Sequence, residues 1–445
     1  MFTSLLLAVS LTGGQPPANY YPPGSLPDVT AVGQPAQLPP IPKAGTLPAI
    51  QEPAPKKDDP APGSPEASEE ARKEGETPPP TKYLIEKSLA ETRLGNILDS
   101  NGIKIYGWTE MSYSVGTASG SNAPVFMNDR ANEFLLNQNY LIVEKAIDAS
   151  KKEFQLGWVT NWILPGSDAR TTVVRGLWDD QLRKNNGGPV LNPIDLYQAY
   201  GQVFLPTLGA EGTTVKLGRF ATHCSYEVVQ AVDTPFLSRS YGFQYNPFTH
   251  TGIWATTPLN DTWTVSYGLA TGSDTFIDRP TNRATFLGQL KWAPKEGKTT
   301  VLLNTVITNP EFIPAEAFTF YNVYNLQLIH KFTDKLTYIL DATYSNTKNV
   351  PNVGNTNWYG AVNYLTYAHT DKVSSLLRAE VFEDTSGFRT GFKGLYTEVT
   401  YGVTVKATDS LLIRPSVRYD NNANSAPFEG SQNLFTATMD VIYRW

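Results

Sequence analysis

The sequence predicts an all-β fold: an antiparallel barrel of about sixteen strands that crosses a membrane. Three observations support this class. Apolar and polar residues alternate along most of the chain after Gly102, short and long connections follow each other in turn, and aromatic residues gather near segment ends. Successive side chains of a strand point to opposite faces, so alternation gives one apolar and one polar face. A membrane barrel needs both, because lipid surrounds it and water fills it.

The first segment, residues 1–14, is expected to be a signal peptide. Its apolar stretch runs from about Leu5 to Leu11, which suits a secretory signal core and is too short to span a bilayer. No Lys or Arg precedes this stretch, so only the α-amine supplies the positive charge that such signals carry. Cleavage near Gly14 and cleavage near Ala18 are both compatible with the sequence.

Residues 15–82 differ in composition from the rest of the chain. They contain 18 of the 33 prolines, with Lys, Glu, Asp, Ala and Ser between them and few large apolar side chains. Such a stretch cannot bury enough apolar surface to offset its ordering entropy, so a disordered, extended arm in the periplasm is expected. Two roles stay open for it, a simple spacer and a tether directed at the cell wall.

Residues 83–101 are expected to form a short amphipathic helix and a lead-in to the barrel. Apolar residues recur there at a spacing typical of one helix face, at Ile85, Leu89, Leu94, Ile97 and Leu98. This helix is expected to lie against the periplasmic mouth of the barrel.

The barrel is predicted for residues 102–445. Its last segment shows the clearest alternation, in which the residues from Phe435 to Trp445 at odd positions are apolar and most of those between them are polar. Sixteen such strands are expected, at residues 103–115, 134–146, 153–164, 195–205, 213–220, 250–257, 262–271, 285–293, 299–308, 320–332, 336–345, 357–368, 373–383, 395–407, 411–420 and 433–445.

The connections separate a barrel from a soluble β-sandwich, which would also show alternation. Those after even-numbered strands are short, such as 258–261 and 369–372, and those after odd-numbered strands are long, such as 165–194 and 221–249. Outer-membrane barrels have short periplasmic turns, long outer loops and both termini in the periplasm. Aromatic residues are expected to form an interfacial girdle on the lipid face, at Trp263, Tyr267, Trp292, Tyr344, Trp358, Tyr419 and Tyr443.

Composition and motifs argue against other function classes. The net charge is −6 over 445 residues, whereas nucleic-acid binding needs clustered Lys and Arg. The single cysteine, Cys224, can form neither an internal disulfide nor a cysteine-based zinc site. No nucleophile motif is evident. No catalytic residue, metal, cofactor or enzymatic activity is therefore expected.

Two segments resemble the OmpL-like family of β-barrel porins. One is LGNILDSNGIKIYGWTEMSY, residues 94–113, and the other is GRFATHCSYEVVQAVDTPFLSRSYGFQYNPFTHTG, residues 218–252. Ser225 stands where the family pattern suggests glycine. The resemblance covers about residues 95–445 and implies an outer-membrane porin. Its matching positions are Gly218, Arg219, Phe220, Tyr226, Glu227, Pro235, Phe236, Ser238, Arg239, Ser240, Tyr241, Pro247, His250, Thr251 and Gly252.

A barrel of sixteen strands is wide enough to leave an aqueous channel, whose selectivity depends on the side chains lining it. The polar face of the last strands is expected to line this channel, with Arg378, Glu380, Glu398, Arg414, Arg418 and Asp440. In general sixteen-stranded porins the third outer loop folds inward, and by resemblance this loop supplies Glu227, Asp233 and Arg239 here.

Two interpretations of these charges stay open. In the first, Glu227 and Asp233 face a basic cluster of Arg378, Arg414 and Arg418 across the lumen and set up a transverse field. In the second, the charges pair directly and hold the loop in place, because buried unpaired charge is costly.

The C-terminus resembles the signal read by the outer-membrane assembly machinery. Its candidate residues are Met439, Val441, Tyr443 and Trp445. The alternative is an ordinary strand that ends in tryptophan.

The leading functional hypothesis is a passive channel for small hydrophilic solutes or ions in the outer membrane. The alternative is a structural or adhesive envelope barrel with a plugged lumen and a cell-wall-directed arm. A barrel enzyme is the least favoured hypothesis. Expected partners are outer-membrane lipid, the assembly machinery and, as in many general porins, two further copies in a homo-trimer.

Overall fold

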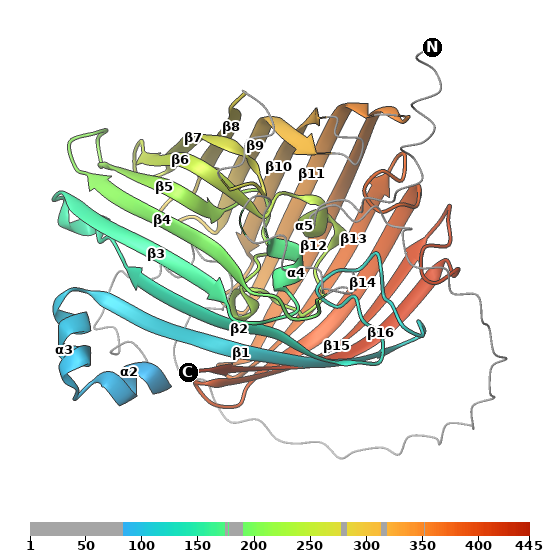
Figure 1. Ribbon diagram of the computed structural model, residues 1–445, viewed down its shortest axis with the longest axis horizontal. Helices are drawn as coiled ribbons and strands as arrows, with labels where there is room; N and C mark the ends of the chain where they lie inside the picture. The colour runs from blue at the N-terminus through green and yellow to red at the C-terminus, as the bar shows by residue number, and fades with distance from the viewer. Residues whose placement is uncertain (1–82, 174–176, 178–189, 277–282, 313–317, 351) are drawn as a thin grey trace, which may run out of the picture.

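The computed structural model describes residues 83–173, 177, 190–276, 283–312, 318–350 and 352–445. The expected signal peptide and arm lie outside these residues. The described chain forms the predicted closed antiparallel barrel of sixteen strands, in which each strand pairs with its sequence neighbours and β1 closes on β16 (Figure 1). The strands are β1 Ile103–Gly116, β2 Phe134–Lys145, β3 Gln155–Ile163, β4 Asp195–Leu205, β5 Thr213–Ala221, β6 Thr249–Pro258, β7 Trp263–Ser273, β8 Thr285–Trp292, β9 Thr299–Phe312, β10 Phe318–Lys331, β11 Leu336–Val350, β12 Gly354–Thr370, β13 Val373–Asp384, β14 Gly394–Lys406, β15 Leu411–Asn422 and β16 Asn433–Arg444.

The alternation of the sequence becomes the two faces of the barrel wall. Large apolar side chains such as Leu217, Leu303 and Met439 are more than half exposed on the outer face, where lipid would cover them. Their neighbours on the inner face are mostly polar and buried, as Arg378 and Glu398 illustrate. Among the described residues, no helix is long and apolar enough to cross a membrane.

The barrel closes where the last residue meets the first strand. The backbone N–H of Trp445 donates to the carbonyl of Gly107 at 3.0 Å. Its indole Nε1 donates to Thr109 Oγ1, also at 3.0 Å. A Cβ on Gly107 would lie 2.5 Å from the indole ring and would also collide with the backbone of β2. Glycine is therefore required where the terminal ring lies on β1.

Three strands are longer than the alternation indicates. Pairing between β11 and β12 continues through Thr347 and Thr356 to Val350 and Gly354, so the connection that follows β11 spans only residues 351–353. The expectation that every odd-numbered strand precedes a long connection is wrong here, and also after β9, which ends at Phe312. The extended hairpins contain few apolar residues, so the pairing of their backbones leaves no period-two signal.

The side chain of Trp358 lies inside the barrel, contrary to its expected place in an outer girdle. Only 2% of Trp358 is exposed, whereas 49% of its neighbour Tyr359 is exposed. Trp358 packs on Phe382, with ring centroids 5.5 Å apart. Because two aromatic residues are adjacent here, the alternation does not show which of them points outward. The prediction that Trp358 is the outward-facing one is wrong for this reason.

Residues 83–101 form two short helices where one was expected, α2 Leu84–Leu89 and α3 Arg93–Ser100. Thr92 caps α3 by accepting the N–H of Gly95 at 3.0 Å, and buried Gly95 lies directly on the carbonyl of Leu89. Both helices contact β1. Arg444 of β16 donates to the hydroxyl of Tyr83 at 3.0 Å, so the described chain begins at the barrel end formed by the short turns.

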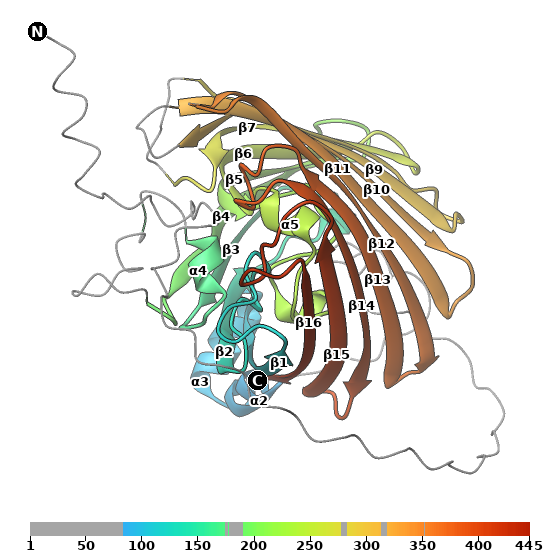
Figure 2. The same ribbon diagram turned by 90° about the vertical axis from the view of Figure 1, so that its right-hand side faces the viewer.

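Segments from three connections meet between the barrel walls, where α4 Ala169–Thr172 and α5 Tyr241–Tyr245 are seen in both views (Figure 2). Gln244 of α5 accepts the N–H of Phe126, from the connection after β1, at 2.9 Å. Arg170 of α4 forms a 2.7 Å ion pair with Asp129 of the same first connection. These contacts fasten the three segments to one another.

Candidate functional site

Residues 222–248, the connection between β5 and β6, carry the family-like motif and contact the inner faces of β11–β16. Two short helical turns shape this connection, the 3-10 turn Ala231–Asp233 and α5. Ser240 caps α5 through its hydroxyl, which accepts the N–H of Phe243 at 3.1 Å. The local fold thus presents main-chain carbonyls and N–H groups of residues 226–242 to the barrel wall.

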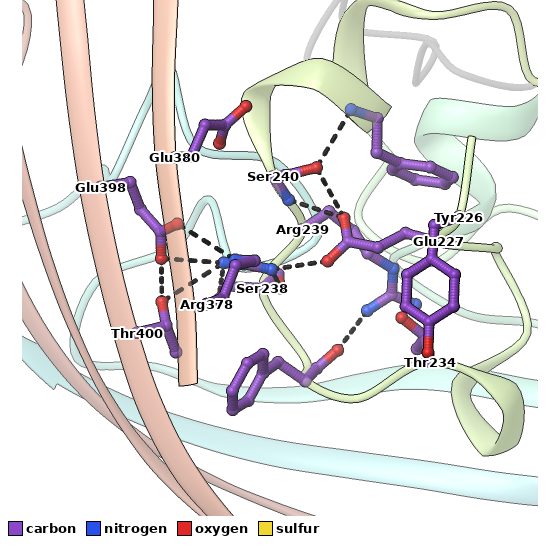
Figure 3. A network of polar contacts seen from close by, with 12 residues as sticks. Tyr226, Glu227, Thr234, Ser238, Arg239, Ser240, Arg378, Glu380, Glu398 and Thr400 are labelled. Carbon is purple, nitrogen blue, oxygen red and sulfur yellow. Dashed lines mark hydrogen bonds and ion pairs between the residues drawn. The ribbon is translucent and has the colours of Figure 1, made fainter. Parts of the chain in front are cut away.

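Arg378 of β13 is the centre of the first set of contacts (Figure 3). Its guanidinium bonds Glu227 Oε1 at 2.7 Å and Glu398 Oε2 at 3.1 Å. The same group donates to the carbonyl of Ser238 at 2.8 Å. The second oxygen of Glu227 accepts the N–H and the hydroxyl of Ser240, both at 2.8 Å. Because every charge here is buried and paired, the set joins the connection firmly to β13 and β14.

Arg414 of β15 makes a second attachment. It donates to the carbonyls of Ala231 at 2.8 Å and Thr234 at 2.6 Å. On the wall it pairs with Asp440 at 2.6 Å and with Glu110 of β1 at 2.9 Å. One guanidinium therefore ties β1, β15, β16 and the 3-10 turn together.

Arg418, also on β15, makes the third attachment. It donates to the carbonyl of Arg239 at 2.7 Å and pairs with Asp420 at 2.7 Å. The hydroxyl of Tyr241 donates to the same carboxylate at 2.8 Å, and the Tyr241 ring lies 5.2 Å from the guanidinium of Arg418. This arrangement combines charge-assisted hydrogen bonds with a cation–π contact.

Two wall carboxylates bind main-chain N–H groups of the same connection. Glu380 accepts from Tyr241 at 2.8 Å and from Gly242 at 2.7 Å. Asp341 of β11 accepts from the N–H of Tyr226 at 2.8 Å and from the hydroxyl of Ser225 at 3.1 Å. The serine that replaces the expected glycine thus supplies an additional hydrogen bond at this position.

The contacts of Glu227, Asp233 and Arg239 bear on both interpretations of the charges. Glu227 is in direct contact with Arg378, so these two charges do not face each other across open space. Asp233 is exposed, and it forms no ion pair with the three wall arginines in the described part of the chain. Arg239 bonds carbonyls of its own connection, including Val228 and Val229 at 3.1 Å each. Glu227 and Arg239 thus bond the wall or their own connection directly.

The start of the connection reaches the opposite wall. His223 bonds the carbonyl of Thr305 at 3.1 Å through Nε2, and its ring stacks on Trp254 at 4.7 Å between centroids. Burial lowers the pKa of His223 to about 4. The neighbouring Cys224 is fully buried, and burial raises the pKa of its thiol. The connection is thus anchored on two sides of the barrel.

Polar side chains on the inner faces of β4–β8 keep partial exposure. They include Tyr200, Gln202, Lys216, Thr264 and Gln289, each half-buried. Gln289 continues a row of amides, since it donates to Asn304 at 2.9 Å and Asn304 donates to Asn325 at 2.8 Å. The half-buried side chains leave this part of the wall partly accessible to water.

Several residues of the site were not selected by sequence reasoning. Glu110, Asp341 and Asp420 are buried acids on inner faces, and their charged character at polar positions of alternating strands was the available signal. His223 has no comparable signal, because its role depends on contacts with β6 and β9. Within the described ranges, no group of three or more His, Cys, Asp or Glu side chains could hold a metal ion.

Comparisons with known proteins agree with this architecture. The family model described as "Putative beta-barrel porin-2, OmpL-like" matches residues 102–445. The anion-selective porin of Comamonas acidovorans is similar in structure, with a TM-score of 0.52, 8% identity, and coverage of 77% of this chain and 99% of that one. The outer membrane channel DcaP of Acinetobacter baumannii gives a TM-score of 0.53 and 10% identity, with 77% and 97% covered. At such identities the likeness shows the fold alone. No curated protein sequence matches the chain.

Proposed function

The chain belongs to the OmpL-like β-barrel porin-2 family of the outer membrane, as its motifs predict, and from this premise we propose that it lets small hydrophilic solutes or ions diffuse passively. Solutes would pass through the water-filled barrel, beside an inward-folded third outer loop, residues 222–248. This loop would narrow the channel without closing it. The arm would lie in the periplasm, on the side of the short turns.

One observation carries the proposal: wall arginines of β13 and β15 bond the third loop, and polar side chains on the inner faces of β4–β8 keep partial exposure. Arg378, Arg414 and Arg418 bond loop carbonyls, whereas Gln202 and Lys216 are half-buried. A partly wetted stretch of wall beside a fixed loop is what a channel with a permanent constriction requires.

Single-channel conductance of the purified full chain in a planar bilayer tests the proposal. Wild type should give steady conductance. Arg414→Ala combined with Arg418→Ala should give larger, noisier steps, because two attachments of the loop are lost. The matched control is Lys295→Ala, which removes an exposed turn lysine that pairs with Asp261 and should leave the steps unchanged. A folded, heat-modifiable wild type that never conducts would refute the channel.

A structural or adhesive envelope barrel is the second candidate. The observation in its favour is the packing of segments from three connections between the walls, through contacts such as Arg170 with Asp129 and Gln244 with Phe126. A barrel closed in this way would need no constriction and would not conduct. The same bilayer recording therefore separates the two functions.

The proposal also covers the assembly signal, the lipid contact and the oligomeric state of the barrel. The terminal residues Met439, Val441, Tyr443 and Trp445 would be read by the outer-membrane assembly machinery. The exposed apolar face would contact lipid, and three copies would assemble into a homo-trimer. Cross-linking of the native membrane tests the trimer directly.

A further inference from the structure

A groove opens on the outer, lipid-facing side of the wall, across the neighbouring strands β7–β11 (Figure 1). Its volume is about 650 Å³. Strand pairing aligns one row of outer-face residues across it, in the order Tyr267, Gly288, Thr305, Tyr324 and Tyr344. Tyrosines thus stand on both sides of two small residues, and the groove is a gap in a row of aromatic rings.

Gly288 keeps the floor of the groove low. A Cβ at this position would lie 3.0 Å from the ring of Phe286 and 3.1 Å from the methyl group of Thr305. The rings of Tyr267 and Tyr324, in contrast, are nearly half exposed at the rim. The depth of the groove therefore follows from side-chain size along one row of the sheet.

The floor of the groove offers no free polar side chain among the described residues. The hydroxyl of Thr305 donates to the carbonyl of Val323 at 3.0 Å, and the amides of Gln289 and Asn304 bond each other on the opposite face of the wall. Water needs two to four polar partners in such a place, and an empty gap forfeits dispersion contacts. The groove therefore suits an aliphatic occupant.

The width of the groove favours a single chain over a second barrel. The backbones of β7 and β10 are three strand spacings apart, about 14 Å, and the exposed rings of Tyr267 and Tyr324 stand on either side. Protein surfaces pack closely inside a membrane where small residues let the backbones approach. Here the rings keep another broad wall away from the floor, whereas a flexible aliphatic chain fits between them.

The polar boundary of the lipid face lies directly beside the groove. On the side away from the short turns, the next outer-face residues of β10 and β11 are Asn322 and Asn346, whose amides bond at 3.2 Å. The rings of Tyr324 and Tyr344 stack with centroids 6.4 Å apart, and their hydroxyls have no hydrogen-bond partner in the described part of the chain. Tyrosine hydroxyls at this level can donate to the ester or phosphate oxygens of a lipid.

We propose that the groove binds one acyl chain of a membrane lipid, in the leaflet at the barrel end opposite the short turns. The polar end of the lipid lies beside Tyr324 and Tyr344, and its chain follows the floor over Gly288 and Thr305. A chain in the groove contacts the protein on several sides, so it exchanges more slowly than chains on the even outer face. This binding does not depend on whether the barrel conducts.

Photo-crosslinking of the full chain in detergent tests the proposal. The probe is a phosphatidylethanolamine with a diazirine halfway along one acyl chain, added in equimolar amount so that detergent covers the rest of the outer face. Peptide mapping should find links concentrated at Leu303 and Tyr324 and few links at the comparably exposed tyrosines of β14–β16, Tyr401, Tyr419 and Tyr443. Equal labelling of both sets would overturn the proposal. Weaker labelling of the groove would overturn it as well, because a second copy would then cover the site.

Matched variants give the second readout. Thr305→Phe places a ring over Gly288, so links in the groove should fall to the level of the control tyrosines. Thr397→Phe makes the same change on the lipid face of β14, outside the groove, and should keep the wild-type pattern. Tyr324→Phe combined with Tyr344→Phe should weaken the labelling, and an unchanged yield would exclude these hydroxyls from the site. Heat-modifiable migration checks that each variant is folded, and undiminished groove labelling in folded Thr305→Phe would refute binding in the groove.

Discussion

Replacing Arg378 with methionine should detach the third loop from β13 and β14. The guanidinium of Arg378 is fully buried between Glu227 of the loop and Glu398 of the wall, at 2.7 and 3.1 Å. Methionine fills much of the same volume and carries no charge. The substitution therefore leaves two carboxylates close together without their shared cation.

The structure sets the size of this effect. Removing one partner of a buried ion pair costs about 3–5 kcal/mol, mainly because the remaining charge is left uncompensated. Here the cost falls on the attached state of the loop, since a released Glu227 regains water. At about 1.4 kcal/mol per factor of ten, the detached fraction should rise by about a hundredfold to a few thousandfold.

The single cysteine offers a direct assay of detachment. Cys224 lies in the third loop and is fully buried, so a maleimide reacts only when this part of the loop opens. Its labelling rate in Arg378→Met should rise by at most the same factor as the detached fraction, because the neighbouring His223 still bonds Thr305. The triple variant Arg378→Met, Glu227→Gln and Glu398→Gln leaves no uncompensated charge and should label nearly as slowly as wild type.

A matched control separates this effect from a general loss of stability. Arg130 pairs with Glu133 at 3.8 Å, with side chains 33% and 46% exposed, so Arg130→Met should change stability by only about 0–1 kcal/mol. An unchanged labelling rate in Arg378→Met, or equal acceleration in Arg130→Met, would refute the reasoning.

Two further predictions concern the barrel seam and the opposite anchor of the loop. Trp445→Ala should lower the free energy of unfolding by about 1–3 kcal/mol, because it removes the contacts with Gly107 and Thr109. The measurement is the temperature at which the heat-modifiable band is lost. Trp445→Phe keeps an aromatic ring and should lower the free energy of unfolding by about 1 kcal/mol, so equal losses in the two variants would contradict this account. Burial lowers the pKa of His223 to about 4, below the ordinary value of about 6.5. As the pH falls, His223 in a released loop is therefore protonated before His223 in the attached loop. The free energy that holds the loop attached is full above pH 6.5 and falls by up to about 3 kcal/mol as the pH decreases to 4. In His223→Phe, which keeps a ring on Trp254, the melting temperature should depend less on pH between 7 and 4.5, and an unchanged dependence would exclude His223 as the cause.

The fold was predictable because lipid and water impose opposite demands on the two faces of each strand. That rule assigns a phase to residues such as Arg414 and Val417, and the structure places both accordingly. It carries no information where a strand extends beyond the apolar band, as at residues 346–350 and 354–356. It also leaves the phase ambiguous where two aromatic residues adjoin, as at Trp358 and Tyr359.

The candidate site was only partly predictable. The polar phase of Arg378 and the family-like motif around Glu227 mark both as inner residues. The two residues in contact are 151 positions apart in the sequence, and no local sequence pattern predicts a contact over such a separation. The arginines bind the main-chain carbonyls of Ala231, Ser238 and Arg239. The side chains of these three residues do not indicate that their carbonyls accept hydrogen bonds from the wall. Such contacts follow from the path of the loop, which depends on the closed barrel.

The wall arginines bond the third loop largely through its main chain. The attachment of the loop therefore depends little on the chemical character of the loop side chains. A carbonyl oxygen is present whatever the side chain, so Arg414 would find the same acceptor at position 231 in any variant with the same loop path. Side chains such as Val228 and Asp233, which are half-buried or exposed, can then be exchanged without loss of these bonds. The barrel thus provides a permanent frame with an interchangeable surface, on which natural variation or design could alter the properties of the channel.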